Sequence, residues 1–355
     1  MRSTSVEFFK RLLSLAGPSG SEVAPARAWR EEAERFADRV WADVAGNSFA
    51  TVNPEGAPCV MIAGHIDEIG LMINHIDDDG FLYFSAIGGW DPEIIVGQRV
   101  EILAKDGSVP GVVGKKAIHL MEKEDRERVS KLKDLWIDIG AESGADARQR
   151  VRIGDAAVLA VEVVDLPNGR IASRSIDNRM GALVALEALR RLSVDRPSAS
   201  VTAVATVQEE ISIAGGGARL GAFGLDPKVA FVVDVTHATD YPGAEKKGHG
   251  DHRLGGGPVV SRGSAVNPVL FERLVEVAEQ EGIPHSIEAV PTRTSTDADN
   301  IFTARAGIAT ALVSVPNRYM HSPNEMVALD DLDRAADLIA ASIRSLTAGE
   351  DFVPS

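Results

Sequence analysis

Acidic side chains and histidines collect at the points where apolar, strand-like runs of this sequence stop. The residues of this kind are His65, Asp67, Asp177, Glu209, Glu210, Asp234 and His321. In open α/β sheets, ligands bind outside the carboxyl ends of the strands, so we expect these side chains to converge at one edge of one sheet. Each alone has a plain structural explanation, and Asp177 can be only the cap of the helix that follows it. Their joint occurrence favours a shared site.

The mixture of imidazoles and carboxylates, without a thiolate, is typical of a site for divalent metal ions. Open catalytic zinc sites accept both kinds of ligand, and two ions roughly 3.5–4 Å apart need a carboxylate between them. We expect Asp177 to bridge two ions, with His65 and Asp234 on one ion and Glu210 and His321 on the other. Three carboxylates and a bridging hydroxide would balance the four positive charges, so the cluster can be partly buried.

Glu209 and Asp67 bind no metal in this scheme, and we expect them to support the reaction. Neighbouring residues of a strand point to opposite faces, so Glu209 and Glu210 can share a site only where the strand ends and bends. That geometry gives Glu210 to a metal and leaves Glu209 as the general base on the bridging water. Asp67 can accept the second imidazole N–H of His65 and fix its tautomer.

Strands and helices alternate along most of the chain. Apolar strand patterns such as 198–208 and 308–315 are followed by helical patterns such as 332–347. This order predicts an α/β fold with a mixed central sheet covered by helices on both faces. Short β-branched segments separated by glycine-rich turns interrupt it and predict an inserted small β-barrel domain. The expected division is a discontinuous catalytic domain, 1–69 and 166–355, with a barrel domain, 70–165, between its two parts.

Composition excludes several classes of partner. A formal net charge of −15 argues against nucleic acid or an anionic membrane as the partner. No apolar stretch approaches the roughly 20 residues of a membrane span, and the N-terminal segment does not resemble a signal peptide. Cys59 is the single cysteine, so no intrachain disulfide can form. We therefore expect a cytoplasmic protein.

Five short motifs, in this order along the chain, resemble those of the M42 family of dinuclear-metal aminopeptidases. They are G-H-I-D-E-I-G, S-I-D-N-R-M-G, V-Q-E-E, D-V-T-H-A-T-D and R-Y-M-H-S-P. The resemblance runs nearly from end to end and includes G-P-S-G near the start and S-T-D-A-D-N near residue 295. It implies a phosphorylase/hydrolase-like metallopeptidase fold whose β-barrel helps to shape assembly and substrate access.

The resemblance also implies roles that agree with those assigned above. It implies two divalent ions per subunit, zinc being favoured and cobalt or manganese being alternatives. His65, Asp234, Glu210 and His321 resemble the terminal ligands, and Asp177 resembles the bridge. Glu209 resembles the family's general base, and Asp67 resembles the acid that orients a histidine. Such enzymes hydrolyse the N-terminal residue of short peptides and often form hollow homo-oligomers, so a dodecamer is expected.

One departure from the family pattern follows the V-Q-E-E motif. Ser212 stands where the family usually has glycine, and the run from Gly215 to Gly217 adds glycines to the loop. Because this loop follows the expected base, the change affects the part of the site that faces the substrate. The preference for the first residue of the substrate therefore stays open.

Other functions stay open at this point. A related co-catalytic deacylase or carboxypeptidase would use the same bridge and base, and only its pocket would differ. A glycosidase would need a pair of carboxyl groups at a set spacing but has little use for two converging histidines. An inactive homologue would be expected to lose the base, whereas Glu209 is present.

Charge suggests how a peptide would be recognised. If the metal cluster is neutral, Glu209, Asp67 and Glu68 leave the mouth of the site negative, and a free α-ammonium group is attracted there. We therefore expect substrates with a free N-terminus.

Overall fold

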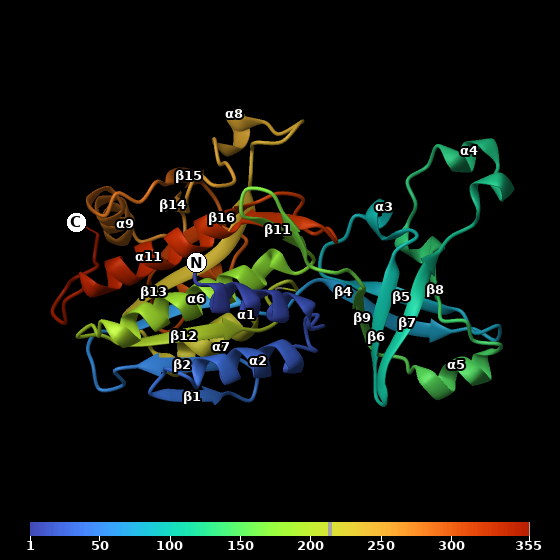
Figure 1. Ribbon diagram of the computed structural model, residues 1–355, viewed down its shortest axis with the longest axis horizontal. Coiled ribbons are helices and arrows are strands. Elements are labelled where there is room, and N and C mark those ends of the chain that lie inside the picture. Colours follow the sequence, from blue (N-terminus) through green and yellow to red (C-terminus); the bar gives the residue numbers. More distant parts are fainter. Residues whose placement is uncertain (212–214, 355) are drawn as a thin grey trace.

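The computed structural model describes residues 1–211 and 215–354 of the chain. Figure 1 shows a layered α/β part and, beside it, a barrel formed by a continuous stretch of the sequence. The expected fold class is confirmed: the structure has a mixed central sheet, helices on both of its faces and an inserted small β-barrel. Ser212, which departs from the family pattern, lies outside the described residues.

The central sheet forms because its inner strands are apolar on both faces. In the described part of the chain, it has eight strands. In spatial order they are β1 (Arg39–Ala42), β2 (Ser48–Val52), β12 (Ser200–Thr206), β3 (Cys59–His65), β13 (Val229–His237), β16 (Ala309–Asn317), β14 (Val259–Gly263) and β15 (Ser286–Val290). The strands from β12 to β16 run parallel, and β2 and β14 join them antiparallel. The carboxyl ends of the parallel strands therefore meet at one edge.

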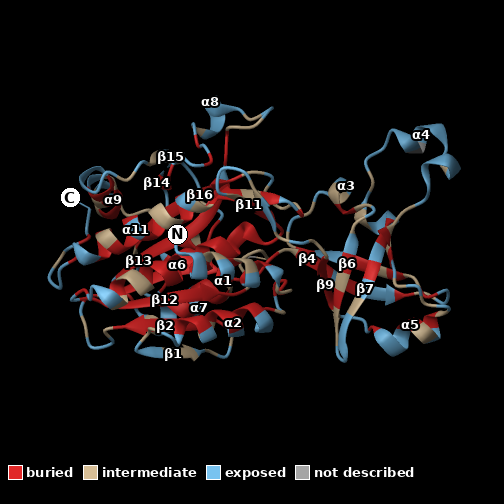
Figure 2. Ribbon diagram, in the orientation of Figure 1, coloured by how far each residue is buried: buried red, intermediate tan, exposed pale blue. Residues whose placement is uncertain are grey.

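Helices cover the two faces of this sheet unequally. The first face carries α1 (Ser3–Ser14), α2 (Val23–Ala33), α6 (Ile176–Val194), α9 (Pro268–Gln280) and α11 (Leu329–Arg344), and the second carries α7 (Gly216–Leu225) and α10 (Ala298–Ile301). Side chains of β3 alternate between them, since Val60 and Ile62 pack on the first face and Met61 and Ala63 on the second. Figure 2 shows this central layer as the most deeply buried part of the molecule.

The barrel lies between β3 and the helix α6 in sequence. Its strands, in spatial order, are β4 (Gly70–Ile76), β5 (Leu82–Ile87), β8 (Trp136–Asp138), β7 (Gly107–Gly114), β6 (Arg99–Ala104) and β9 (Ala156–Leu159). Short helical segments join them: α3 (Pro92–Ile95), η1 (Ile118–Leu120), α4 (Lys123–Arg126), η2 (Leu132–Asp134) and α5 (Gly144–Arg150). The barrel has its own apolar core. The division into two domains at residues 69 and 166 stays a prediction.

A second, small sheet pairs two strands that follow the barrel in sequence with one strand that begins at residue 325. It contains β10 (Val164–Leu166), β11 (Arg170–Ser173) and β17 (Glu325–Ala328). The strand β11 pairs with β17 antiparallel and leads directly into α6. A short helix, α8 (Lys246–His249), lies between β13 and β14 in sequence. Among the described residues, no helix has both the length and the apolar character that crossing a membrane requires.

Candidate metal centre

Three adjacent strands of the central sheet supply most of the candidate ligands. His65 is the last residue of β3, and Asp234 lies within β13, which pairs with β3. Glu209 and Glu210 follow β12, which runs beside β3 on its other side. Between β12 and these glutamates, Gln208 has a φ of 61°, so the chain turns sharply where the strand ends. Both glutamates thereby reach the same cleft.

Asp177 joins the other side chains at this edge of the central sheet, but it does not come from a strand of that sheet. It lies at the start of α6, after the strand β11 of the small sheet. Backbone contact brings it near His65, because a Cβ built on Gly64 would lie 2.4 Å from the carbonyl carbon of Gly181. The missing side chain of Gly64 therefore lets α6 pack directly on β3, and that of Gly181 lets the same helix approach the carbonyl of Val233 in β13. The side chain of Asn178 also donates to the carbonyl of Val233, next to Asp234, at 2.8 Å.

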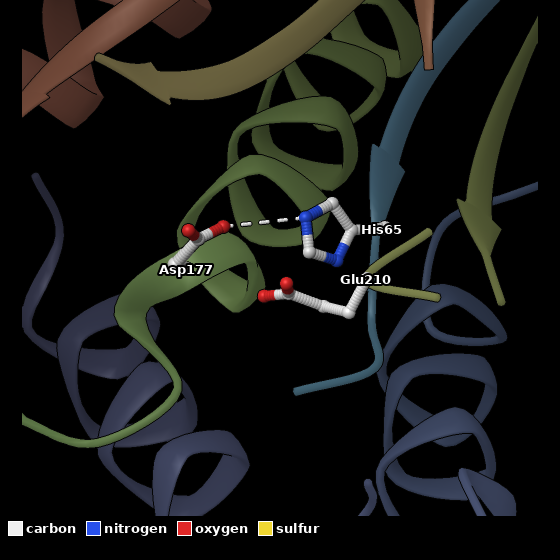
Figure 3. Close-up of side chains that lie close together, drawn as sticks. All are labelled: His65, Asp177 and Glu210. Carbon is white, nitrogen blue, oxygen red and sulfur yellow. Dashed lines mark ion pairs between the residues drawn. The ribbon is translucent and has the colours of Figure 1, made fainter. Parts of the chain in front are cut away.

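The carboxylate of Asp177 lies between the two histidines. Its Oδ1 is 3.2 Å from Nε2 of His65, and its Oδ2 is 3.5 Å from Nε2 of His321. On the His65 side, Oδ1 of Asp234 lies 3.8 Å from the same imidazole nitrogen. On the other side, Oε2 of Glu210 lies 3.2 Å from Nε2 of His321. Figure 3 shows Asp177 turned toward His65, with the Glu210 carboxylate beside them.

Asp67 links several parts of the site. Its carboxylate accepts the backbone N–H groups of Glu209 and Glu210, both at 3.2 Å, and the hydroxyl of Ser19 at 2.6 Å. Its Oδ1 is also 3.3 Å from Nδ1 of His65, which is ion-pair contact without the alignment of a hydrogen bond. Despite full burial, the pKa of Asp67 is held below its ordinary value by His65 and Ser19. The role of Asp67 as the orienter of His65 stays a prediction.

Glu68 does not contribute charge to the mouth of the site, as the sequence had suggested. Its side chain is buried and forms ion pairs with Arg174 and, at 2.8 Å, with Arg179. It also accepts the backbone N–H of Gly17 at 3.0 Å. Because its charge is neutralised by two buried guanidinium groups, Glu68 joins segments of the fold and cannot attract a substrate.

The carboxylates of the cluster are crowded in a way that a cation would relieve. Burial raises the pKa of Glu209 to about 10, and Asp234 adds to this shift while His65 opposes it. Burial raises the pKa of Asp234 well above its usual range, and burial together with Asp177 raises that of Glu210. The imidazoles of the cluster therefore offset only part of the repulsion between these carboxylates. Divalent cations can replace protons at such a site.

The residues present fit a metal site on two further observations. One carboxylate oxygen of Glu210, Oε1, is buried and has no hydrogen-bond partner among the described residues. A buried polar atom of this kind is costly unless something binds it. In addition, His65, Asp177 and Glu210 each offer one potential ligand atom, and these three atoms lie within 4.8 Å of one another. Imidazole and carboxylate are the ligands that zinc and neighbouring divalent ions accept.

Two buried acids near the cluster were missed by the sequence reasoning. Glu325 accepts the backbone N–H groups of Asp177 and of His321, each at 2.8 Å. Asp297 accepts the hydroxyl of Thr206 at 2.5 Å, and burial raises its pKa to about 6. Asp297 falls within S-T-D-A-D-N and Glu325 follows M-H-S-P-N, so both were inside or beside recognised motifs.

The cluster lines a cleft of about 630 Å³. Its other walls come from β13, β15 and the chain after β15, including His237, Glu288 and Arg293. Glu288 is held by the hydroxyls of Thr236 and Ser261 at 2.8 and 3.2 Å. The cleft is therefore large enough for a residue of a peptide and carries acidic groups beyond the candidate ligands.

Comparisons with known proteins agree with this geometry. The sequence pattern of the family described as M42 glutamyl aminopeptidase matches residues 46–338. A lysyl aminopeptidase of Pyrococcus furiosus is 36% identical over 352 residues, which cover 98% of this chain and 99% of that protein.

Solved structures show the same fold. A TET aminopeptidase from the marine sediment archaeon Thaumarchaeota archaeon SCGC AB-539-E09 has a TM-score of 0.92 at 32% identity, covering 97% of this chain and 96% of that one. The Pyrococcus horikoshii TET1 peptidase, which can assemble into a tetrahedron or a large octahedral shell, has a TM-score of 0.84 at 31% identity, covering 96% and 100%. The chain therefore belongs to the M42 family and is an aminopeptidase.

Proposed function

We propose that this aminopeptidase works with two divalent ions held by the cluster described above. His65 and Asp234 hold one ion, Glu210 and His321 hold the other, and Asp177 binds both. The observation that carries the proposal is the position of Asp177, whose two oxygens face the two histidines separately. When bound, such ions polarise a carbonyl oxygen and lower the pKa of water. Zinc is favoured, and cobalt and manganese are the alternatives.

The residues of the chain that move protons are distinct from the ligands. Glu209 accepts a proton from the attacking water and delivers it to the leaving amine, because its carboxylate reaches the cleft while its neighbour Glu210 faces His321. Asp67 supports this geometry by accepting the N–H groups of both glutamates. It thereby fixes the turn that presents Glu209 to the substrate.

The substrate is a short peptide with a free N-terminus. With two divalent ions bound by Asp177, Glu210 and Asp234, the carboxylates of Glu209 and Glu288 remain in the cleft without a metal to neutralise them. They attract the α-ammonium group and disfavour a carboxylate at the same position. Asp67 and Glu68 do not contribute to this attraction, because both are buried and engaged elsewhere.

The test of this proposal is to block the amino group of the substrate. Acetylation of the N-terminus is expected to lower kcat/KM by about 10-fold to 100-fold, because a charge-assisted contact contributes about 1.5–3 kcal/mol. The measurement compares a peptide with its N-acetyl form, using enzyme stripped by a chelator and then reloaded with Zn²⁺ or Co²⁺. Equal rates for the two peptides would exclude recognition of the α-ammonium group and favour the deacylase alternative. Full activity of the stripped enzyme would exclude a role for metal ions in the reaction.

We further propose that the chain forms a large homo-oligomer through its barrel, a dodecamer being favoured because the related solved structure PhTET1-12s has a dodecamer in its asymmetric unit. Trp90 does not supply the exposed surface for this, since its indole donates to the carbonyl of Gly70 and packs on the barrel core. Apolar side chains are exposed elsewhere on the barrel, at Val112, Ile118, Leu120 and Val129. We also propose that the protein resides in the cytoplasm.

Light scattering tests the assembly. We expect a particle of about twelve times the 37.7 kDa of one chain at micromolar concentration, because the exposed apolar residues of the barrel need a protein surface to cover them. A mass equal to one chain would contradict the proposal, and a stable dimer would keep the barrel contact but exclude the closed shell.

A further inference from the structure

We infer that Glu325 is a positioning residue that fixes the distance between the bridging and terminal ligands of one metal position. The inference rests on the two-metal function proposed above. Glu325 is 2% exposed and lies at the start of β17. Its Oε2 accepts the backbone N–H of Asp177, and its Oε1 accepts that of His321, both at 2.8 Å. One carboxylate thereby joins the main chains of two candidate ligands.

The small sheet explains how Glu325 comes to this place. The strand β17 pairs antiparallel with β11, and Glu325 lies opposite Ser173, four residues before Asp177. The turn that carries His321 leads into the same strand. Glu325 therefore lies between the start of α6 and the turn of His321, where its two oxygens can reach both.

The backbone of His321 gives a second reason why this carboxylate is needed. His321 has a φ of 58°, in the left-handed region that residues other than glycine adopt infrequently. Tyr319, two residues earlier, is also left-handed with a φ of 62°. The N–H of His321 donates to Glu325 at 2.8 Å, and this buried hydrogen bond offsets the strain of the turn. The imidazole is then held facing Asp177 and Glu210.

Glu325 acts through the ligands and is not itself placed as one. Both of its oxygens are engaged by main-chain N–H groups, and the compact group of potential ligand atoms comprises His65, Asp177 and Glu210. A glutamine at this position would keep the shape but would have one acceptor oxygen, and its NH₂ would face an N–H donor. One of the two bonds would be lost, and the spacing of Asp177 and His321 would relax.

The experiment measures retained metal and does not depend on turnover. Wild-type protein loaded with Co²⁺ and dialysed against a weak chelator is expected to keep two ions per chain. Glu325→Gln is expected to keep one, with affinity for the other weakened by roughly 10-fold to 100-fold, the usual effect of removing a group that orients ligands. Elemental analysis gives the stoichiometry, and the visible absorption of Co²⁺ reports the changed ligand geometry.

Asp331 provides a matched control. Its buried carboxylate likewise accepts two main-chain N–H groups, those of Gly255 and Gly257 at 2.7 and 2.8 Å. Asp331→Asn is expected to keep both ions. If Glu325→Gln fails to fold, Glu325→Asp decides, because the shorter acid keeps its charge but cannot span both N–H groups. Retention of two ions with unchanged affinity by the folded Glu325 variant would overturn this inference, as would the same loss in Asp331→Asn. Fewer than two ions in the wild type would instead overturn the proposed function.

Discussion

Replacing Glu209 with glutamine is expected to lower kcat by at least about 100-fold while both metal ions stay bound. General acid–base catalysis contributes about 10²–10⁴ in rate, and glutamine cannot take up the proton of the attacking water. The side chain of Glu209 lines the cleft, and its Oε2 lies 3.8 Å from Nε2 of His65, whereas the bridging candidate Asp177 lies 3.2 Å from the same nitrogen. Turnover and metal content of the purified variant together check the assignment.

The adjacent residue supplies the comparison for this prediction. Glu210→Gln removes a proposed ligand that lies 3.2 Å from His321, so it should lose metal as well as activity. A Glu209→Gln variant with near wild-type turnover would exclude Glu209 as the base. If the Glu209→Gln variant lost an ion, Glu209 would be a metal ligand, and another residue would have to be the general base.

Asp177→Asn is expected to weaken both metal positions at once, by at least about 100-fold, and to abolish turnover. Removing a group that only orients ligands lowers metal affinity by about 10-fold to 100-fold. Removing a residue that binds both ions directly should lower it by no less. Asparagine keeps the size of the side chain but lacks the charge and the second acceptor that face His65 and His321. Calorimetric titration with Zn²⁺ measures the two affinities.

Two further variants distinguish a metal-bridging role of Asp177 from a purely structural one. Asp234→Asn should loosen one ion and spare the other, because Asp234 contacts the His65 side of the cluster. Glu187→Gln removes a buried acid from the same helix, where it pairs with Arg2 and Arg190, and should leave metal binding intact. If Asp177→Asn binds two ions as tightly as the wild type, Asp177 only caps the helix.

The parts of the site that could be predicted from sequence are those whose position follows from a strand. His65, Glu209 and Glu210 come directly after apolar runs, and parallel strands bring their carboxyl ends to one edge. The fold class was predictable for the same reason, since alternating strands and helices leave few arrangements.

The rest depended on contacts between distant segments. Asp177 reaches the cluster because Gly64 lets α6 pack closely on β3 and Gly181 lets the same helix approach β13, and the local sequence does not show which segment each glycine will contact. Glu68 looked like a charged neighbour of the site, but its charge is taken up by Arg174 and Arg179, more than one hundred residues away. Local sequence cannot distinguish an acid facing solvent from one paired with a distant arginine.

The spread of the site along the chain has a consequence for when activity can first arise during synthesis. His65 is made early, but Asp177 faces His321 only once β17 can pair with β11 and bring in Glu325. A nascent chain that stops before residue 325 therefore lacks the groups that complete the second metal position. The enzyme can therefore become competent to remove N-terminal residues only after synthesis has passed β17 and this strand has paired with β11.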